Sequence, residues 1–129
     1  MHVTVSAPGK IHLLGEHIVV YGRPALLAAI DKRVYVTIKT QNSKLKNQKS
    51  GKFIINTNED DSLVKETISI FKKAFHIEKL PPLEITITSQ LPAGSGLGSS
   101  AAVGAAVLGA LLKYVKNLWN PTRINELTF

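Results

Sequence analysis

The feature that most constrains the fold is a glycine-rich stretch between two segments of opposite character. It runs Leu91-Pro92-Ala93-Gly94-Ser95-Gly96-Leu97-Gly98-Ser99-Ser100, and an alanine-rich apolar segment follows it. Glycines at alternate positions let the backbone turn its N–H groups toward one point. The two serines lie where a helix would begin, and a helix start offers unpaired N–H groups and the positive end of its dipole. The stretch therefore predicts a strand-to-helix turn that can bind phosphate.

Residue periodicity on both sides of this stretch predicts an α+β fold. Apolar and polar residues alternate over residues 3–7, 34–38 and 83–88, as is typical of strands. Shorter strands are expected at residues 18–21, 25–30 (buried) and 53–55. Helical spacing predicts helices at residues 63–75 and 99–116, and a third helix beginning near Asn120-Pro121, with Thr122 as its N-cap. We expect Pro8-Gly9 to end the first strand, and we expect a lysine-rich loop to join residues 34–38 and 53–55 as a hairpin.

Composition limits the classes of function. The chain has 129 residues, enough for one domain, and it has no cysteine, which excludes disulfides, zinc thiolates and thiol catalysis. The N-terminus does not resemble a signal peptide, and the apolar run at residues 101–112 is too short to span a bilayer. We therefore expect a cytoplasmic protein without a membrane partner. The net charge of +7 suits anionic ligands such as nucleotides. The lysine-rich loop lacks interleaved aromatic residues, which disfavours a nucleic-acid surface.

Other phosphate and catalytic motifs fit the glycine-rich stretch less well. A Walker loop needs a lysine after its last glycine, whereas Ser99 follows Gly98 here. Residues 96–101 match the dinucleotide pattern G-x-G-x-x-A, but Pro92 separates the strand from the glycines and no acidic residue follows at the ribose-binding distance. The serine-hydrolase elbow is absent because Ala93, not glycine, precedes Ser95 by two positions. A simple packing turn remains the alternative to an anion site.

A second group of candidate residues lies between Pro8 and Gly22. Lys10 follows the Pro8-Gly9 turn, so a rigid backbone could hold its ammonium beside a phosphoryl group in transfer. Taken alone, it could equally be an ordinary surface lysine. Glu16 and His17 follow a glycine, so either could face a pocket.

Together the two stretches resemble the GHMP kinase family, in the form carried by its mevalonate kinase branch. The segment Pro92-x-Gly94-x-Gly96-Leu97-Gly98-Ser99-Ser100-Ala101 is similar to the family's ATP-binding motif, and residues 7–22 are similar to its first motif. The resemblance implies an α+β N-terminal domain like domain 2 of ribosomal protein S5. That fold has a mixed, mostly antiparallel sheet with helices on one face.

The resemblance also implies roles for individual residues. Lys10 would be catalytic and would contact the acceptor, together with Glu16 and His17. Ser100 would help to hold Mg²⁺. The reaction implied is transfer of the ATP γ-phosphoryl group to the hydroxyl of mevalonate, in isoprenoid biosynthesis. The residues that would bind ATP are Pro92, Ala93, Gly94, Ser95, Gly96, Leu97, Gly98, Ser99, Ser100, Ala101 and Ala102.

Members of this family are much longer than this chain. They carry an acidic metal ligand, a catalytic aspartate and a C-terminal domain that have no counterpart here. We therefore expect residues 1–129 to be an incomplete N-terminal ATP-binding domain, inactive alone and prone to self-association through uncovered apolar surface. The intact enzyme could be a homodimer. Three alternatives stay open: another GHMP kinase (phosphomevalonate, homoserine or sugar kinase), a basic nucleotide- or RNA-binding module, and a dinucleotide-binding domain.

Overall fold

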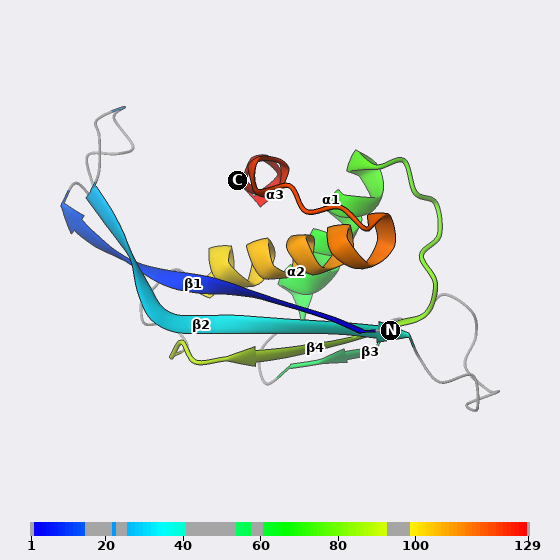
Figure 1. Cartoon of the computed structure of the whole chain (residues 1–129), viewed down its shortest axis with the longest axis horizontal. Helices are drawn as coiled ribbons and strands as arrows, with labels where there is room; N and C mark the ends of the chain where they lie inside the picture. Colours follow the sequence, from blue (N-terminus) through cyan, green and yellow to red (C-terminus); the bar gives the residue numbers. More distant parts are fainter. Residues whose placement is uncertain are drawn as a thin grey trace.

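The described part of the chain forms a twisted sheet with helices on one face (Figure 1). A computed structural model describes residues 2–14, 22, 26–40, 54–57, 61–92 and 99–128. The strands are β1 (His2–Leu14), β2 (Leu26–Thr40), β3 (Ile54–Asn56) and β4 (Leu83–Ser89). The helices are α1 (Ser62–Ala74), α2 (Ser99–Lys116) and α3 (Pro121–Thr128).

The strand order is β1-β2-β4-β3. The pairs β1/β2 and β2/β4 are antiparallel, and the pair β3/β4 is parallel. Helix α2 packs on β1 and β2, and α1 and α3 pack against α2. The predicted mixed, mostly antiparallel sheet with helices on one face is therefore confirmed.

The first strand does not end at Pro8-Gly9, so that prediction is wrong. β1 continues to Leu14, and its register against β2 shifts between Pro8 and Lys10. An irregularity of this kind accommodates a proline, and β1 is an edge strand, where a missing N–H group is tolerated.

Of the strand predicted at residues 25–30, residues 26–30 belong to β2, but they are not buried. Leu26 is 53% exposed and Leu27 is 48% exposed. β4 pairs with β2 only from Val34 onward, so beyond that point β1 and β2 form a two-stranded arm that extends from the sheet (Figure 1). An apolar run of six residues does not reveal by itself whether another layer covers it.

The predicted hairpin between residues 34–38 and 53–55 is also wrong. β4 occupies the edge of β2, pairing it from Val34 to Thr40, while β3 pairs only with β4 and in parallel. A parallel pair needs a crossover, and α1 lies between β3 and β4 in the chain. β4 is longer than β3, and its apolar residues match the buried face of β2, so β4 lies between β2 and β3.

Alternation along the strands separates a buried face from a polar one. Val36 and Ile38 are fully buried beneath the helices, and Ile87 and Ile85 oppose them on β4. The other face is polar, with Lys39 Nζ 3.6 Å from Glu84 Oε2. Asn56 Nδ2 also donates to Glu84 Oε1 at 2.9 Å. The large side chains that are fully buried come from both layers: Phe71, Ile38, Leu83, Ile85, Leu111, Val34, Val36, Val64 and Val107.

Helix α1 ends in a C-terminal hydrogen-bond pattern built on a histidine. Ile77 N–H donates to Lys72 C=O at 2.9 Å, and His76 N–H donates to Lys73 C=O at 3.4 Å. These two bonds define a Schellman motif, whose C′ residue takes a left-handed conformation that usually selects glycine. His76 occupies that position with φ of 53°. At the other end, Asp61 is the N-cap residue but makes no side-chain cap bond.

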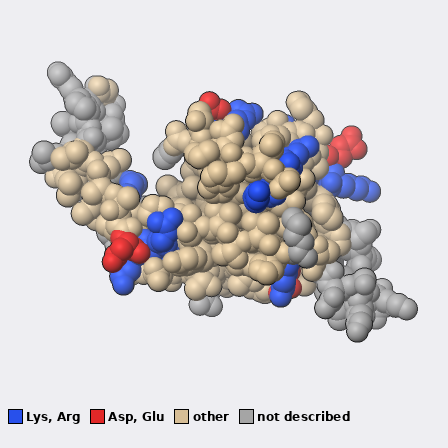
Figure 2. Space-filling view, viewed as in Figure 1, with Lys and Arg blue, Asp and Glu red and all other residues tan. Residues whose placement is uncertain are grey.

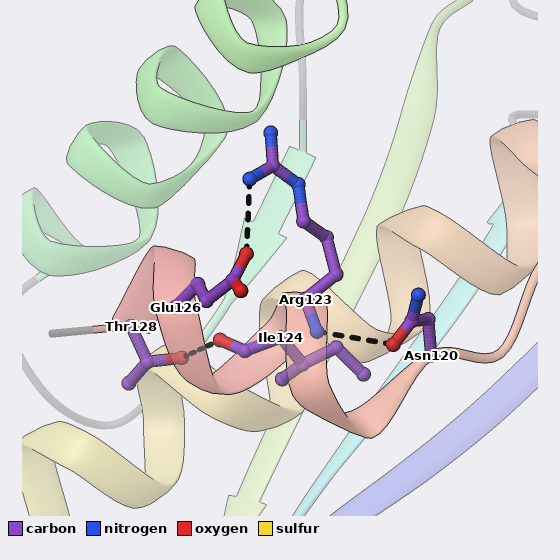
Figure 3. Close-up of polar contacts among 5 residues, drawn as sticks. All are labelled: Asn120, Arg123, Ile124, Glu126 and Thr128. Atoms are coloured by element: carbon purple, nitrogen blue, oxygen red, sulfur yellow. Dashed lines mark hydrogen bonds and ion pairs between the residues drawn. The ribbon is translucent and has the colours of Figure 1, made fainter.

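The N-cap of helix α3 lies two residues before Thr122, the residue predicted for that position. Asn120 Oδ1 accepts a hydrogen bond from Arg123 N–H at 3.1 Å, so Asn120 is the N-cap (Figure 3). Pro121 then occupies the first helical position, where its lack of an N–H group costs nothing. An asparagine cap followed by proline is a stronger start signal than the threonine that was predicted.

Candidate functional site

A groove of about 360 Å³ lies where β1, the start of α2 and α3 meet. Its lining comes from three parts of the sequence and is largely apolar. The residues are Val5, Ser6, Ala7, Pro8, Lys10, Ala101, Ala102, Ala105, Trp119, Pro121, Ile124, Asn125 and Thr128.

Lys10 is the one charged residue among the described residues that line the groove. It is half-buried and directly follows the register shift in β1. The strand pairs again at Lys10↔Ala29, so the backbone that carries the lysine is held on both sides of the irregularity. A positive charge fixed beside an apolar groove is less screened by water than one on an open surface.

The N-terminal part of α2 forms the second wall of the groove. Ala101, Ala102 and Ala105 line it, and Ser99 and Ser100 form the preceding half-turn. Ser99 is half-buried and Ser100 is exposed. The first turn of a helix carries free N–H groups and the positive end of the dipole. Lys10 and this helix start thus place two electropositive features around one groove.

Helix α3 forms the third wall, although no motif in its sequence predicts a function for it. Figure 3 shows its polar contacts: Arg123 Nη1 lies 3.1 Å from Glu126 Oε2, and Thr128 Oγ1 donates to Ile124 C=O at 2.7 Å. Trp119, in the segment before α3, is 56% exposed and lines the same groove. Trp119 lies between Asn117 and Asn120 in a short connection, and this large aromatic residue is the signal that could identify the wall.

The sequence-predicted site residues fall into two groups. Lys10, Ala101 and Ala102 line the groove, Ser99 and Ser100 begin α2, and Pro92 is exposed after β4. Ala93, Gly94, Ser95, Gly96, Leu97 and Gly98 lie outside the described residues, as do Glu16 and His17.

The predicted magnesium site has limited support among the described residues. They contain no group of three or more His, Asp or Glu side chains that could hold a metal ion, and no acidic residue among them lines the groove. Mg²⁺ takes oxygen ligands and is often held by one or two carboxylates plus substrate phosphates. The Ser100 hydroxyl could supply one such oxygen, but one hydroxyl alone does not make a metal site, so most ligands of a bound Mg²⁺ would come from the nucleotide phosphates.

On the face shown in Figure 2, the charged side chains of the described residues are spread out. Figure 2 shows Lys and Arg side chains singly or in small groups, with acidic residues beside several of them. Among the described helices, none combines the length and apolar character needed to cross a bilayer.

Two family models match the chain. The model described as "GHMP kinases N terminal domain" matches residues 62–129. The model described as "Galactokinase galactose-binding signature" matches residues 2–40, which cover β1 and β2.

Curated relatives are similar along nearly the whole chain. A mevalonate kinase from Thermococcus sibiricus is 39% identical over 144 residues, covering 98% of this chain and 43% of the relative. A mevalonate kinase from Methanothermobacter thermautotrophicus is 40% identical over 114 residues, covering 88% of this chain and 37% of the relative. The chain therefore spans less than half the length of these relatives.

Solved structures agree on the fold. The Methanococcus jannaschii mevalonate kinase superposes with a TM-score of 0.84 at 25% identity, over 99% of this chain and 45% of that one. The Streptococcus pneumoniae phosphomevalonate kinase superposes with a TM-score of 0.74 at 26% identity, over 99% of this chain and 39% of that one.

Proposed function

Because this chain belongs to the GHMP kinase family, we propose that residues 1–129 form the ATP-binding N-terminal part of a mevalonate kinase-like enzyme. The observation that carries the proposal is the meeting of Lys10 and the start of α2 at one groove. Phosphoryl transfer needs positive charge that is already in place around the phosphates. The curated relatives, which are named mevalonate kinase, support mevalonate as the acceptor.

In this proposal the glycine-rich stretch and the first turn of α2 bind the ATP phosphates through backbone N–H groups. Lys10 faces the γ-phosphoryl group and the acceptor, and Glu16 and His17 contribute to the acceptor site. The bond between the γ-phosphorus and the bridging oxygen breaks, so that ADP leaves, and a bond forms between the γ-phosphorus and the acceptor hydroxyl oxygen. The hydroxyl proton would pass to the catalytic aspartate that members of the family carry. Mg²⁺, held mainly by the phosphates with Ser100 as one ligand, would neutralise developing charge.

A sugar acceptor is the second candidate. It is favoured by the match of β1 and β2 to the galactose-binding signature. Against it, the described lining of the groove is mostly apolar, whereas a hexose presents several hydroxyl groups that each need a hydrogen-bond partner.

The first experiment measures ATP binding to the 129-residue chain by calorimetry. Lys10→Met should weaken ATP binding by roughly tenfold, because a phosphate loses a charge-assisted contact. Lys39→Met is the matched control, since Lys39 pairs with Glu84 on the polar face of the sheet, away from the helices. If both variants bind ATP as tightly as the unaltered chain, Lys10 is not part of the ATP site.

The acceptor is tested by ADP release with ATP and mevalonate, phosphomevalonate, homoserine or galactose. We expect little turnover from the 129-residue chain alone and acceptor-dependent turnover, highest with mevalonate, from a chimera in which the chain replaces the corresponding part of an archaeal mevalonate kinase. Preference of that chimera for galactose would favour the sugar-kinase alternative.

A further inference from the structure

Arg33 lies at the point where β1, β2 and β4 separate. It pairs with Pro8 on β1, directly before the register shift that leads to Lys10. β4 pairs with β2 only from Val34 onward, so Arg33 is also the first β2 residue beyond β4. Two parts of the chain therefore diverge beside Arg33. One is the β1–β2 arm that carries Lys10, and the other is the segment that follows β4 and leads to α2.

The side chain of Arg33 holds β1. Its Nε donates to Ser6 Oγ at 2.9 Å, and its Nη2 donates to Ser6 C=O at 3.4 Å, in partly buried surroundings. A planar guanidinium can satisfy two acceptors on one residue at once, which the single ammonium of lysine cannot match in geometry. Ser6 lines the groove and lies four residues before Lys10.

The main-chain groups of Arg33 bind Gln90, the residue that follows β4. Arg33 N–H donates to Gln90 Oε1 at 2.9 Å, and Gln90 N–H donates to Arg33 C=O at 2.9 Å. Gln90 follows the last residue of β4, so this reciprocal pair extends the attachment of the chain to β2 by one residue. The direction in which the chain leaves toward Pro92 and α2 is thereby fixed relative to β2.

We propose that Arg33 is a positioning residue, which fixes Lys10 relative to the chain segment leading into the helix start that binds phosphate. This proposal rests on the proposed function, because it assigns a purpose to the relative placement of Lys10 and α2. Arg33 acts through Ser6 and Gln90 and does not itself touch the nucleotide. Its loss should therefore affect phosphate recognition more than the binding of a nucleoside without phosphates.

The test uses the 129-residue chain with Arg33→Ala, Arg33→Lys and Ser6→Ala, and with Lys32→Ala as control. Lys32 is an exposed cation on the same strand, so its removal changes net charge equally. Amide hydrogen exchange is measured along β1, at Gln90–Leu91 and in α1, and affinities are measured for ATP and for adenosine.

Arg33→Ala should speed exchange near Lys10 and weaken ATP binding, each by about tenfold, since bonds from a charged donor are lost. Exchange in α1 and the affinity for adenosine should stay within about twofold of the unaltered chain. Ser6→Ala should reproduce most of the effect, Arg33→Lys should fall between, and Lys32→Ala should change neither measurement.

The outcomes separate this proposal from the proposed function. If the unaltered chain binds ATP and Arg33→Ala binds it equally well, with unchanged exchange near Lys10, the positioning role is overturned and the function stands. If exchange in α1 rises as much as exchange in β1, Arg33 serves general stability and the proposal is again overturned. If the unaltered chain fails to bind ATP, the proposed function fails, and faster exchange of Arg33→Ala confined to β1 would still support Arg33 as the residue that fixes Lys10.

Discussion

A Cβ atom placed on Gly109 of α2 would lie 3.2 Å from Cζ3 of Trp119 and 3.1 Å from Cγ1 of Val5. Both distances are shorter than ordinary carbon–carbon contact. The absence of a side chain at Gly109 thus lets β1 and the segment before α3 approach α2 together. Since Val5 and Trp119 line the groove, this glycine helps to determine its shape.

Gly109→Ala should destabilise the chain by about 1 kcal/mol, because overpacking outweighs the gain in helix propensity. Denaturant unfolding measures the change. Gly104→Ala is the control, since its Cβ would lie 3.7 Å from Thr128 Cγ2, which is ordinary contact, and it should stabilise by up to about 1 kcal/mol. Equal effects of the two substitutions would show that the packing around Gly109 is not tight.

Trp119 should report on ligands in the groove. It is the single tryptophan of the chain, and it is exposed at the groove. A ligand that covers the ring should shift its fluorescence emission to shorter wavelength, with a midpoint equal to the affinity measured by calorimetry. Trp119→Phe should abolish the signal while calorimetry still detects binding. An unchanged spectrum at saturating ATP and mevalonate would place both ligands away from Trp119.

His76→Gly should stabilise the chain by about 0.5–1 kcal/mol, since glycine adopts the left-handed conformation of this cap without the cost paid by a residue with a Cβ. The change is measured by thermal or denaturant unfolding. Asn117 has the same φ of 53° after α2 and provides the comparison. Asn117→Gly should have a smaller effect, because asparagine tolerates this region well.

Asn120→Ala should destabilise the chain by about 1 kcal/mol through loss of the α3 cap. Asn120→Asp keeps an oxygen acceptor for Arg123 N–H and should retain most of the stability. Because α3 is a wall of the groove, Asn120→Ala should also raise amide exchange in α3 more than in α1. Uniform exchange in both helices would mean that the cap acts on the whole domain.

The exposed leucines of the β1–β2 arm should promote self-association. Leu13 is 51% exposed, Leu26 53% and Leu27 48%. Leu26→Ser combined with Leu27→Ser should shift the chain toward monomer in light scattering, because less apolar surface is available for association. Leu118→Ser is the control, since Leu118 is 53% exposed but lies after α2. An equal shift from the control would exclude a specific role for the arm.

Local signals in the sequence determined most elements and their type. Alternation at residues 34–38 and 83–88 places the buried face of β2 and β4, and helical spacing gives the bounds of α1 and α2 to within one residue. The glycine-rich stretch marks the start of α2 at Ser99. These features depend on near neighbours in the chain, whose preferences the residue pattern expresses directly.

Only the tertiary structure decided which elements become neighbours. It placed β4 between β2 and β3, carried β1 past Pro8 and left Leu26 and Leu27 exposed. It also joined Lys10 to α2 and α3 around the groove, and brought Arg33 between Ser6 and Gln90. Such contacts join residues far apart in the sequence. They form because apolar faces from distant segments must cover one another, and the local pattern of either segment does not identify its partner.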